Sequence, residues 1–204
     1  MTEQAKAGSA DRRPLVVGIG GTTGGISSTE RALRIALDAA EEAGFRTRMF
    51  GGADMAKLPL YDPRAPGRTA EEREFVDTVR EASAMIIASP GYHGSISGLV
   101  KNTLDLLEET ARDEARSYLA DMPVGLIATA YGWQATGSTI AALRAIVHAL
   151  RGWPTPFAAA INSLITKFDD AGGASDPAVV EQLRLIGRQV ARFAPLTQGH
   201  SHQP

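Results

Sequence analysis

A segment near the N-terminus combines glycines and hydroxyl side chains in a pattern suited to holding a phosphate. This hydroxyl-rich turn, residues 20–29, contains four glycines and precedes an amphipathic run. Glycines let a backbone approach a ligand closely, and a helix start presents unpaired N–H groups and a positive dipole end. The same pattern also fits an ordinary glycine turn before a capped helix. The candidate phosphate-binding residues are Thr22, Thr23, Ser27, Ser28 and Thr29.

A second segment, residues 89–105, follows the apolar run 84–88 and precedes another amphipathic run. Between a strand and a helix, such a loop lies where open α/β sheets hold ligands. It carries one aromatic ring and little charge, which suits a flat, weakly charged ring system. Two residues of this loop have an alternative interpretation without a ligand. Tyr92 would then be a half-buried aromatic that packs against the protein, and His93 would be a surface side chain. The candidate contacts are Pro90, Gly91, Tyr92, His93, Gly94 and Ser95.

A third segment, residues 130–138, places two aromatic side chains beside two glycines. These residues would wall one edge of the same site, and Trp133 alternatively anchors a dimer interface. The candidate contacts here are Tyr131, Gly132, Trp133 and Gln134.

Strand-like and helix-like runs alternate along the chain, which predicts an α/β fold. The pattern favours a flavodoxin-like three-layer sandwich, with a five-stranded parallel sheet of order 2-1-3-4-5 and helices on both faces. The three segments above follow the first, third and fourth strands, whose carboxyl ends border the crevice in that order. The predicted strands are 14–20, 45–50, 84–88, 123–129 and 157–161, and the predicted helices are 27–43, 70–82, 98–112, 137–151 and 178–193.

Composition narrows the class of protein further. The formal net charge is −2 without a Lys/Arg cluster, so we expect no nucleic-acid partner. The sequence has no cysteine, which excludes disulfides and thiol catalysis. No run of about 18 apolar residues predicts a membrane span, and the polar N-terminus does not resemble a secretory signal, so a cytoplasmic protein is expected. We expect one domain over 14–194, with disordered segments 1–13 and 195–204.

Residues 89–105 read S-P-G-Y-H-G-S-I-S-G-L-V-K-N-T-L-D. This resembles the NAD(P)H-dependent FMN reductases of the flavodoxin-like superfamily, a group that includes quinone, azo-dye and chromate reductases. That family commonly reads S/T-P-x-Y-N/H-G-S-x-x-G-x-L-K-N-x-L-D at this place, where it contacts the isoalloxazine. The resemblance extends from about Leu15 to Ile161. The hydroxyl-rich turn departs from the family pattern because Gly24 stands where an arginine is expected, which predicts weaker retention of FMN.

The resemblance implies FMN as cofactor and NADPH or NADH as co-substrate. A hydride would pass to FMN and on to a second acceptor, or reduced flavin would leave, with a flavin-dependent monooxygenase as a possible recipient. No catalytic side chain and no metal site are expected, because the flavin carries the chemistry. A homodimer or homotetramer is implied. Alternatives are a quinone, azo or chromate reductase using bound FMN, a flavodoxin-like electron carrier, which the small net charge disfavours, and a flavin- or nucleotide-sensing module.

Overall fold

Five parallel strands form the centre of the protein in a computed structural model that describes residues 11–198, with side chains described up to residue 195. Their order is β2-β1-β3-β5-β6, and every neighbouring pair along this path is parallel. The α/β sandwich with a parallel sheet is therefore confirmed. The strands are β1 (Leu15–Gly20), β2 (Arg46–Phe50), β3 (Ala84–Tyr92), β5 (Pro123–Ala130) and β6 (Trp153–Asn162).

The predicted count of five strands was wrong, because the sheet has six. The additional strand is β4 (Ser95–Ile96), which pairs with the end of β3 in antiparallel fashion. It was missed because two residues are too few to show a strand periodicity in the sequence. When β4 is left out and the five parallel strands are numbered along the chain, their order in the sheet is the predicted 2-1-3-4-5.

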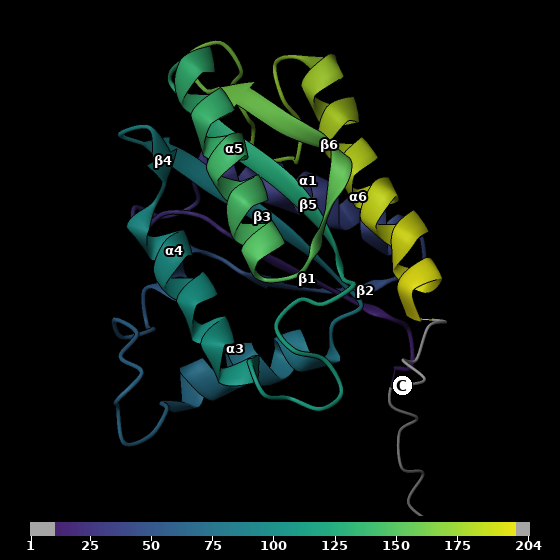
Figure 1. Ribbon diagram of the computed structural model, residues 1–204. Helices are drawn as coiled ribbons and strands as arrows, with labels where there is room; N and C mark the ends of the chain where they lie inside the picture. The colour runs from purple at the N-terminus through teal and green to yellow at the C-terminus, as the bar shows by residue number, and fades with distance from the viewer. Residues whose placement is uncertain (1–10, 199–204) are drawn as a thin grey trace, which may run out of the picture.

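Helices cover both faces of the sheet (Figure 1). One face carries α1 (Ser28–Glu42) and α6 (Pro177–Gln198), which pack on each other. The elements associated with the other face are α3 (Ala70–Glu81), α4 (Gly98–Asp105), the 3-10 helix η1 (Leu106–Thr110) and α5 (Trp133–Ala149). A short helix, α2 (Gly52–Met55), follows β2.

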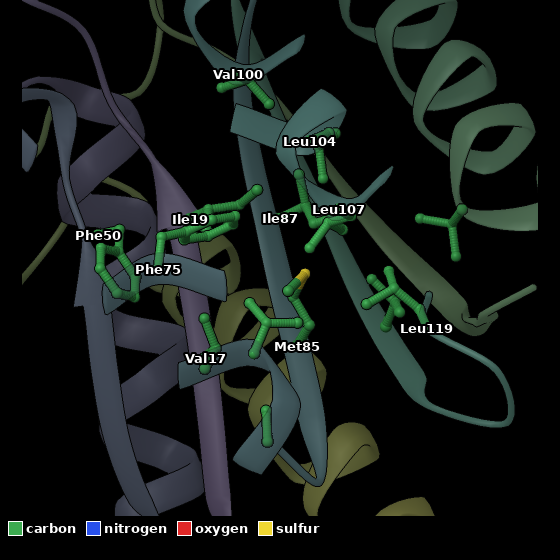
Figure 2. Close-up of a cluster of buried hydrophobic side chains, with 14 of the residues drawn as sticks. Val17, Ile19, Phe50, Phe75, Met85, Ile87, Val100, Leu104, Leu107 and Leu119 are labelled. Carbon is green, nitrogen blue, oxygen red and sulfur yellow. The ribbon is translucent and has the colours of Figure 1, made fainter. Parts of the chain in front are cut away.

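Two apolar clusters result from the alternation of side chains along the strands. On β1, Val17 and Ile19 join the cluster beneath α3, α4 and α5, whereas Val16 joins the cluster beneath α1 and α6. Figure 2 shows the cluster beneath α3, α4 and α5. In it the Phe50 and Phe75 rings pack edge to face, with their centroids 5.1 Å apart. Because both faces of these strands are buried, they read as continuous apolar runs in the sequence.

Several element boundaries differ from the predicted ones. α5 begins at Trp133 rather than residue 137, because exposed Gly137 is tolerated inside the helix. β3 extends to Tyr92 because the loop after it folds back as a hairpin. β6 begins at Trp153 despite its prolines, which an edge strand accommodates. The predicted helix 98–112 splits into α4 and η1, and the short helix α2 lies between the predicted strand 45–50 and the predicted helix 70–82.

The C-terminal helix extends beyond the predicted end of the domain. α6 continues to Gln198, four residues past the expected domain end at 194. The rest of the predicted disordered segments, apart from residues 11–13, lies outside the described residues. Within residues 11–198, no helix has the length and apolarity needed to cross a bilayer.

The segment between α2 and α3 is held by polar contacts rather than by regular structure. The Asn102 side chain on α4 accepts a hydrogen bond from the Tyr61 N–H at 2.8 Å and donates one to the Pro59 carbonyl at 2.9 Å. Arg68 pairs with Glu109 at 2.8 Å and lies over the Tyr61 ring. Burial, followed by the Glu109 carboxylate, raises the pKa of Tyr61. Asn102 therefore fixes this long segment to α4.

Candidate active site

A cleft of about 900 Å³ lies at the carboxyl ends of the parallel strands. All three segments singled out in the sequence contribute to its walls, as the topology of an open α/β sheet requires. Its lining residues are Thr22, Ser27, Ser28, Thr29, Pro90, Gly91, Tyr92, Gly94, Thr129, Ala130, Tyr131, Gly132, Gln134, Ala135, Ser138 and Ser163.

The hydroxyl-rich turn enters α1 through a capping box. The Ser27 hydroxyl accepts a hydrogen bond from the Glu30 N–H at 3.3 Å, and the Glu30 carboxylate accepts one from the Ser27 N–H at 3.0 Å. The first N–H groups of a helix have no intrahelical acceptor. Among the described residues, nothing accepts a hydrogen bond from the N–H of Ser28 or Thr29. These donors are thus available to an anion at the cleft.

Glu30 also ties the turn to the start of α2. Its second carboxylate oxygen accepts a hydrogen bond from the Gly52 N–H at 2.9 Å. Gly52 lies so close to Thr22 that a Cβ there would come within 1.8 Å of the Thr22 carbonyl oxygen. The turn therefore rests on the backbone of α2, and only glycine fits at that contact.

A hydroxyl pair connects the turn to β5. The Thr29 and Thr129 hydroxyl oxygens lie 2.6 Å apart, and both residues are buried. Two hydroxyls carry two protons, and one hydrogen bond between them uses only one. The pair therefore joins two walls of the cleft and retains a donor.

The hairpin, residues 89–97, forms the opposite wall, and a buried serine holds its base. The Ser89 hydroxyl donates to the Pro90 carbonyl at 2.9 Å and accepts from the Ser97 N–H at 3.0 Å. Ser97 in turn caps α4 by accepting from the Val100 N–H at 3.2 Å. At the tip, His93 (φ 51°) and Gly94 (φ 86°) make the two-residue turn of left-handed backbone that suits a tight hairpin.

The third segment, residues 130–138, comprises the last residue of β5, two connecting residues and the beginning of α5. Tyr131 is 77% exposed and Tyr92 is 51% exposed, and both residues line the cleft. Gly91 sits beneath α5, where a Cβ would lie 2.7 Å from the Thr139 hydroxyl. The hairpin and α5 therefore touch through a glycine.

Most of the predicted site residues meet at the cleft, but four do not line it. Thr23 is exposed on the turn, Trp133 is 61% exposed on α5, and Ser95 lies in β4. His93 occupies the hairpin tip, where its backbone conformation is what the turn uses. The predicted residues that do line the cleft are Thr22, Ser27, Ser28, Thr29, Pro90, Gly91, Tyr92, Gly94, Tyr131, Gly132 and Gln134.

Five lining residues were not among the predicted contacts. Thr129 ends the predicted strand 123–129 and Ala130 begins the third segment, whereas the structure makes both the last residues of β5, where they border the crevice. Ala135 and Ser138 became accessible to the cleft because α5 begins early. Ser163 follows β6, and the position of this strand beside β5 was the only available signal. The missed residues are Thr129, Ala130, Ala135, Ser138 and Ser163.

The cleft is electrically neutral in its side chains. No Asp, Glu, Lys, Arg or His lines it in the described part of the chain. Within that part, no group of three or more His, Cys, Asp or Glu side chains is arranged to hold a metal ion. Hydroxyls, backbone groups and aromatic faces therefore determine what it binds.

A second hollow of about 470 Å³ lies beside the end of α3 and contains arginines. Arg116 donates hydrogen bonds to the Val79 carbonyl at 2.6 Å and the Ala82 carbonyl at 2.7 Å, which caps α3. Burial lowers the pKa of Arg116, and Arg80 pairs with Asp113 at 2.7 Å. Arg116 and Arg80 therefore have partners within the protein that stabilise the end of α3.

The chain matches the model of the NADPH-dependent FMN reductase family over residues 14–164. This match covers well over half of the chain, and the protein belongs to that family.

Curated relatives include FMN-dependent NADPH-azoreductases of staphylococci. The one from Staphylococcus haemolyticus is 31% identical over 125 residues, which cover 57% of this chain and 62% of the relative. The one from Staphylococcus aureus strain USA300 is 32% identical over 110 residues, covering 50% and 54%. The match thus spans less than two thirds of these relatives' length.

Solved structures share the fold. An apo NADH:FMN oxidoreductase, EMOB, superposes with a TM-score of 0.68 at 23% identity, covering 88% of this chain and 89% of that one. FerB, an NAD(P)H:acceptor oxidoreductase of Paracoccus denitrificans, gives 0.71 at 17% identity, covering 90% and 98%. An archaeal flavodoxin gives 0.59 at 11% identity, covering 89% and 99%. The flavodoxin-like fold is therefore confirmed.

Proposed function

We propose that this protein is an NAD(P)H-dependent FMN reductase. One observation carries the proposal: a single cleft has the hydroxyl-rich turn of a helix start on one side, and exposed aromatic rings beside a glycine-bearing hairpin on another. Phosphate suits the first wall, and a flat ring system suits the second. FMN has both parts.

The residues present fit FMN in size and in donor chemistry. The cleft volume of about 900 Å³ lies within the usual range for cofactor sites. The N–H groups of Ser28 and Thr29 and the Thr22 hydroxyl would hold the phosphate. The hairpin backbone and Tyr131 would hold the ring, which agrees with the family to which the chain belongs.

When bound, FMN supplies the capacity to accept a hydride and to pass electrons on. The chain would bind and orient the two partners and exclude water from between them. The exposed faces of Tyr92 and Tyr131 are suited to stacking on a planar ring. Holding donor and acceptor face to face is a proximity effect, which is worth about 7–11 kcal/mol in well-oriented reactions.

A reductase of azo or quinone acceptors with bound FMN is the second candidate. Its support is the pair of exposed aromatic residues that line the cleft, Tyr92 and Tyr131, together with staphylococcal relatives that bear the name azoreductase. A panel of acceptors under excess NADPH separates the two. Oxidation that needs only free FMN supports the first, and oxidation that requires a quinone or azo dye supports the second.

A direct experiment combines purified protein with FMN and either NADPH or NADH in air. We expect loss of the nicotinamide absorbance that depends on both protein and FMN. Bound yellow flavin without nicotinamide consumption would instead support an electron carrier or a flavin-sensing module, and the proposal would fail.

The remaining parts of the proposal concern location and assembly. A cytoplasmic location suits an enzyme that consumes reduced nicotinamide nucleotides. A homodimer or homotetramer would cover two exposed aromatic residues, Tyr131 at the cleft and Trp133 at the start of α5, and light scattering measures the oligomeric state. A flavin-dependent monooxygenase as recipient of reduced flavin is tested by coupling the two enzymes in solution.

A further inference from the structure

The neutral lining of the cleft leaves the charge of a phosphate without a facing cation. A phosphate monoester carries roughly 1.5 to 2 negative charges at neutral pH. The hydroxyl-rich turn has Gly24, not a cationic residue, within its sequence. A segment that enters the cleft wall and contains a cationic side chain is the loop between β6 and α6, residues 163–176 (Figure 1), whose Ser163 lines the cleft.

This loop begins in the cleft wall. Ser163 lines the cleft, and its N–H donates to the Ala130 carbonyl at 2.8 Å. The Lys167 ammonium donates to the Ser163 carbonyl at 2.7 Å. The ammonium group thus lies one hydrogen bond away from a lining residue.

The same loop is also fixed to the beginning of α1. The Arg31 guanidinium donates to the Phe168 carbonyl at 3.0 Å and pairs with the Asp170 carboxylate. Phe168 is buried in the cluster beneath α1 and α6. Lys167 therefore contacts Ser163 in the cleft wall, and the next residue, Phe168, is bound by Arg31 of α1. The N-terminus of α1 faces the cleft.

Lys167 also differs from the other described lysines in its partners. Lys57 lies 3.9 Å from an Asp54 oxygen, and Lys101 lies 2.6 Å from an Asp105 oxygen. In residues 11–198, no carboxylate lies within 4 Å of the Lys167 ammonium, and its side chain is exposed. A flexible four-carbon stem lets such an ammonium move toward an anion, whereas Arg31 is already paired.

We propose that Lys167 supplies the cation for the phosphate of FMN. This inference rests on the proposed function, and it concerns a residue that is distant from the hydroxyl-rich turn in sequence. Leaving the Ser163 carbonyl for the phosphate would replace a hydrogen bond to a neutral acceptor with one between two ionised groups, so that the ammonium would face an anion. Lys167 then selects for flavin that carries a phosphate.

The experiment measures the dissociation constants of FMN and riboflavin by quenching of flavin fluorescence. Lys167→Met removes the charge and keeps a long side chain, Lys167→Arg restores the charge, and Lys57→Met is the matched control. We expect Lys167→Met to weaken FMN about fivefold to tenfold, with riboflavin unchanged and a shallower salt dependence. Lys167→Arg should recover most of the loss, and Lys57→Met should bind both ligands as the parent does.

Equal losses for FMN and riboflavin, or no loss for either, would overturn the inference. So would a raised KM for NADPH with an unchanged FMN dissociation constant, since Lys167 would then bind the nicotinamide nucleotide. If the parent protein binds neither flavin, the proposed function itself fails. If the parent binds FMN and Lys167→Met has no effect, only the inference about Lys167 fails.

Discussion

The two principal walls of the cleft obtain their shape in different ways. The hydroxyl-rich turn depends on a side chain, because the Glu30 carboxylate accepts hydrogen bonds from Ser27 and from Gly52, 22 residues further along the chain. The hairpin depends on backbone conformation at its tip and on buried Ser89 at its base. One wall therefore requires a distant element, whereas the other is largely local.

This difference has an electrostatic consequence. Glu30 gives the turn its geometry but places a negative charge behind the proposed phosphate site. The helix N-terminus and the hydroxyls must offset that charge. The hairpin carries no such conflict, because a ring system brings little charge to it. We expect substitutions at the turn to change phosphate-dependent affinity and substitutions at the hairpin to leave it unchanged.

The largest expected effect is a loss of stability when a glycine that supports one of the walls is replaced by alanine. Gly52 supports the hydroxyl-rich turn, and Gly91 belongs to the hairpin. Gly52→Ala drives a Cβ into the Thr22 backbone, whereas Gly91→Ala meets mainly the Thr139 side chain, which has more freedom to adjust. We expect Gly52→Ala to cost about 2–3 kcal/mol of unfolding free energy and Gly91→Ala about 1 kcal/mol. Chemical denaturation measures both. Equal losses would show that the turn is no more rigidly supported than the hairpin.

A charge placed at each end of the cleft separates phosphate binding from ring binding. Ser28→Asp adds a carboxylate at the start of α1 that the helix itself tolerates. We expect it to weaken FMN by about tenfold or more through like-charge repulsion and to spare riboflavin. Ser138→Asp, on α5, is the comparison and should affect both flavins alike. Titration with the two flavins decides, and an unchanged FMN affinity in Ser28→Asp would remove the turn from the site.

The smallest effect is expected at the hairpin tip. His93 has φ 51°, a conformation that asparagine adopts more readily. His93→Asn should change the melting temperature slightly upward, by a gain of about 0.5 kcal/mol or less, and leave FMN affinity as it is, since His93 does not line the cleft. A clear loss of FMN affinity would indicate that the imidazole contacts the ligand after all.

The sequence by itself determined the features that depend on neighbouring residues. The capping box of Ser27 and Glu30 spans three positions, and the apolar runs that became β1 and β3 reflect burial on both faces. The alternation of strand-like and helix-like runs predicted the order of the parallel strands. It also predicted most of the cleft lining, because the carboxyl ends of the strands meet at one edge of the sheet. The local pattern did not predict where α5 begins. Gly137 was expected at the helix start, but an exposed glycine inside a helix costs only about 1 kcal/mol and does not mark the boundary.

Only the tertiary structure decided the contacts between distant residues. Thr29 meets Thr129 across 100 positions, Gly52 packs on the hydroxyl-rich turn, and Ser163 joins the cleft from the loop after β6. Nothing in the spacing of residues specifies such pairs, because they arise from how the packed helices and the sheet place separate segments of the backbone. The position of Lys167 beside that wall belongs to the same class.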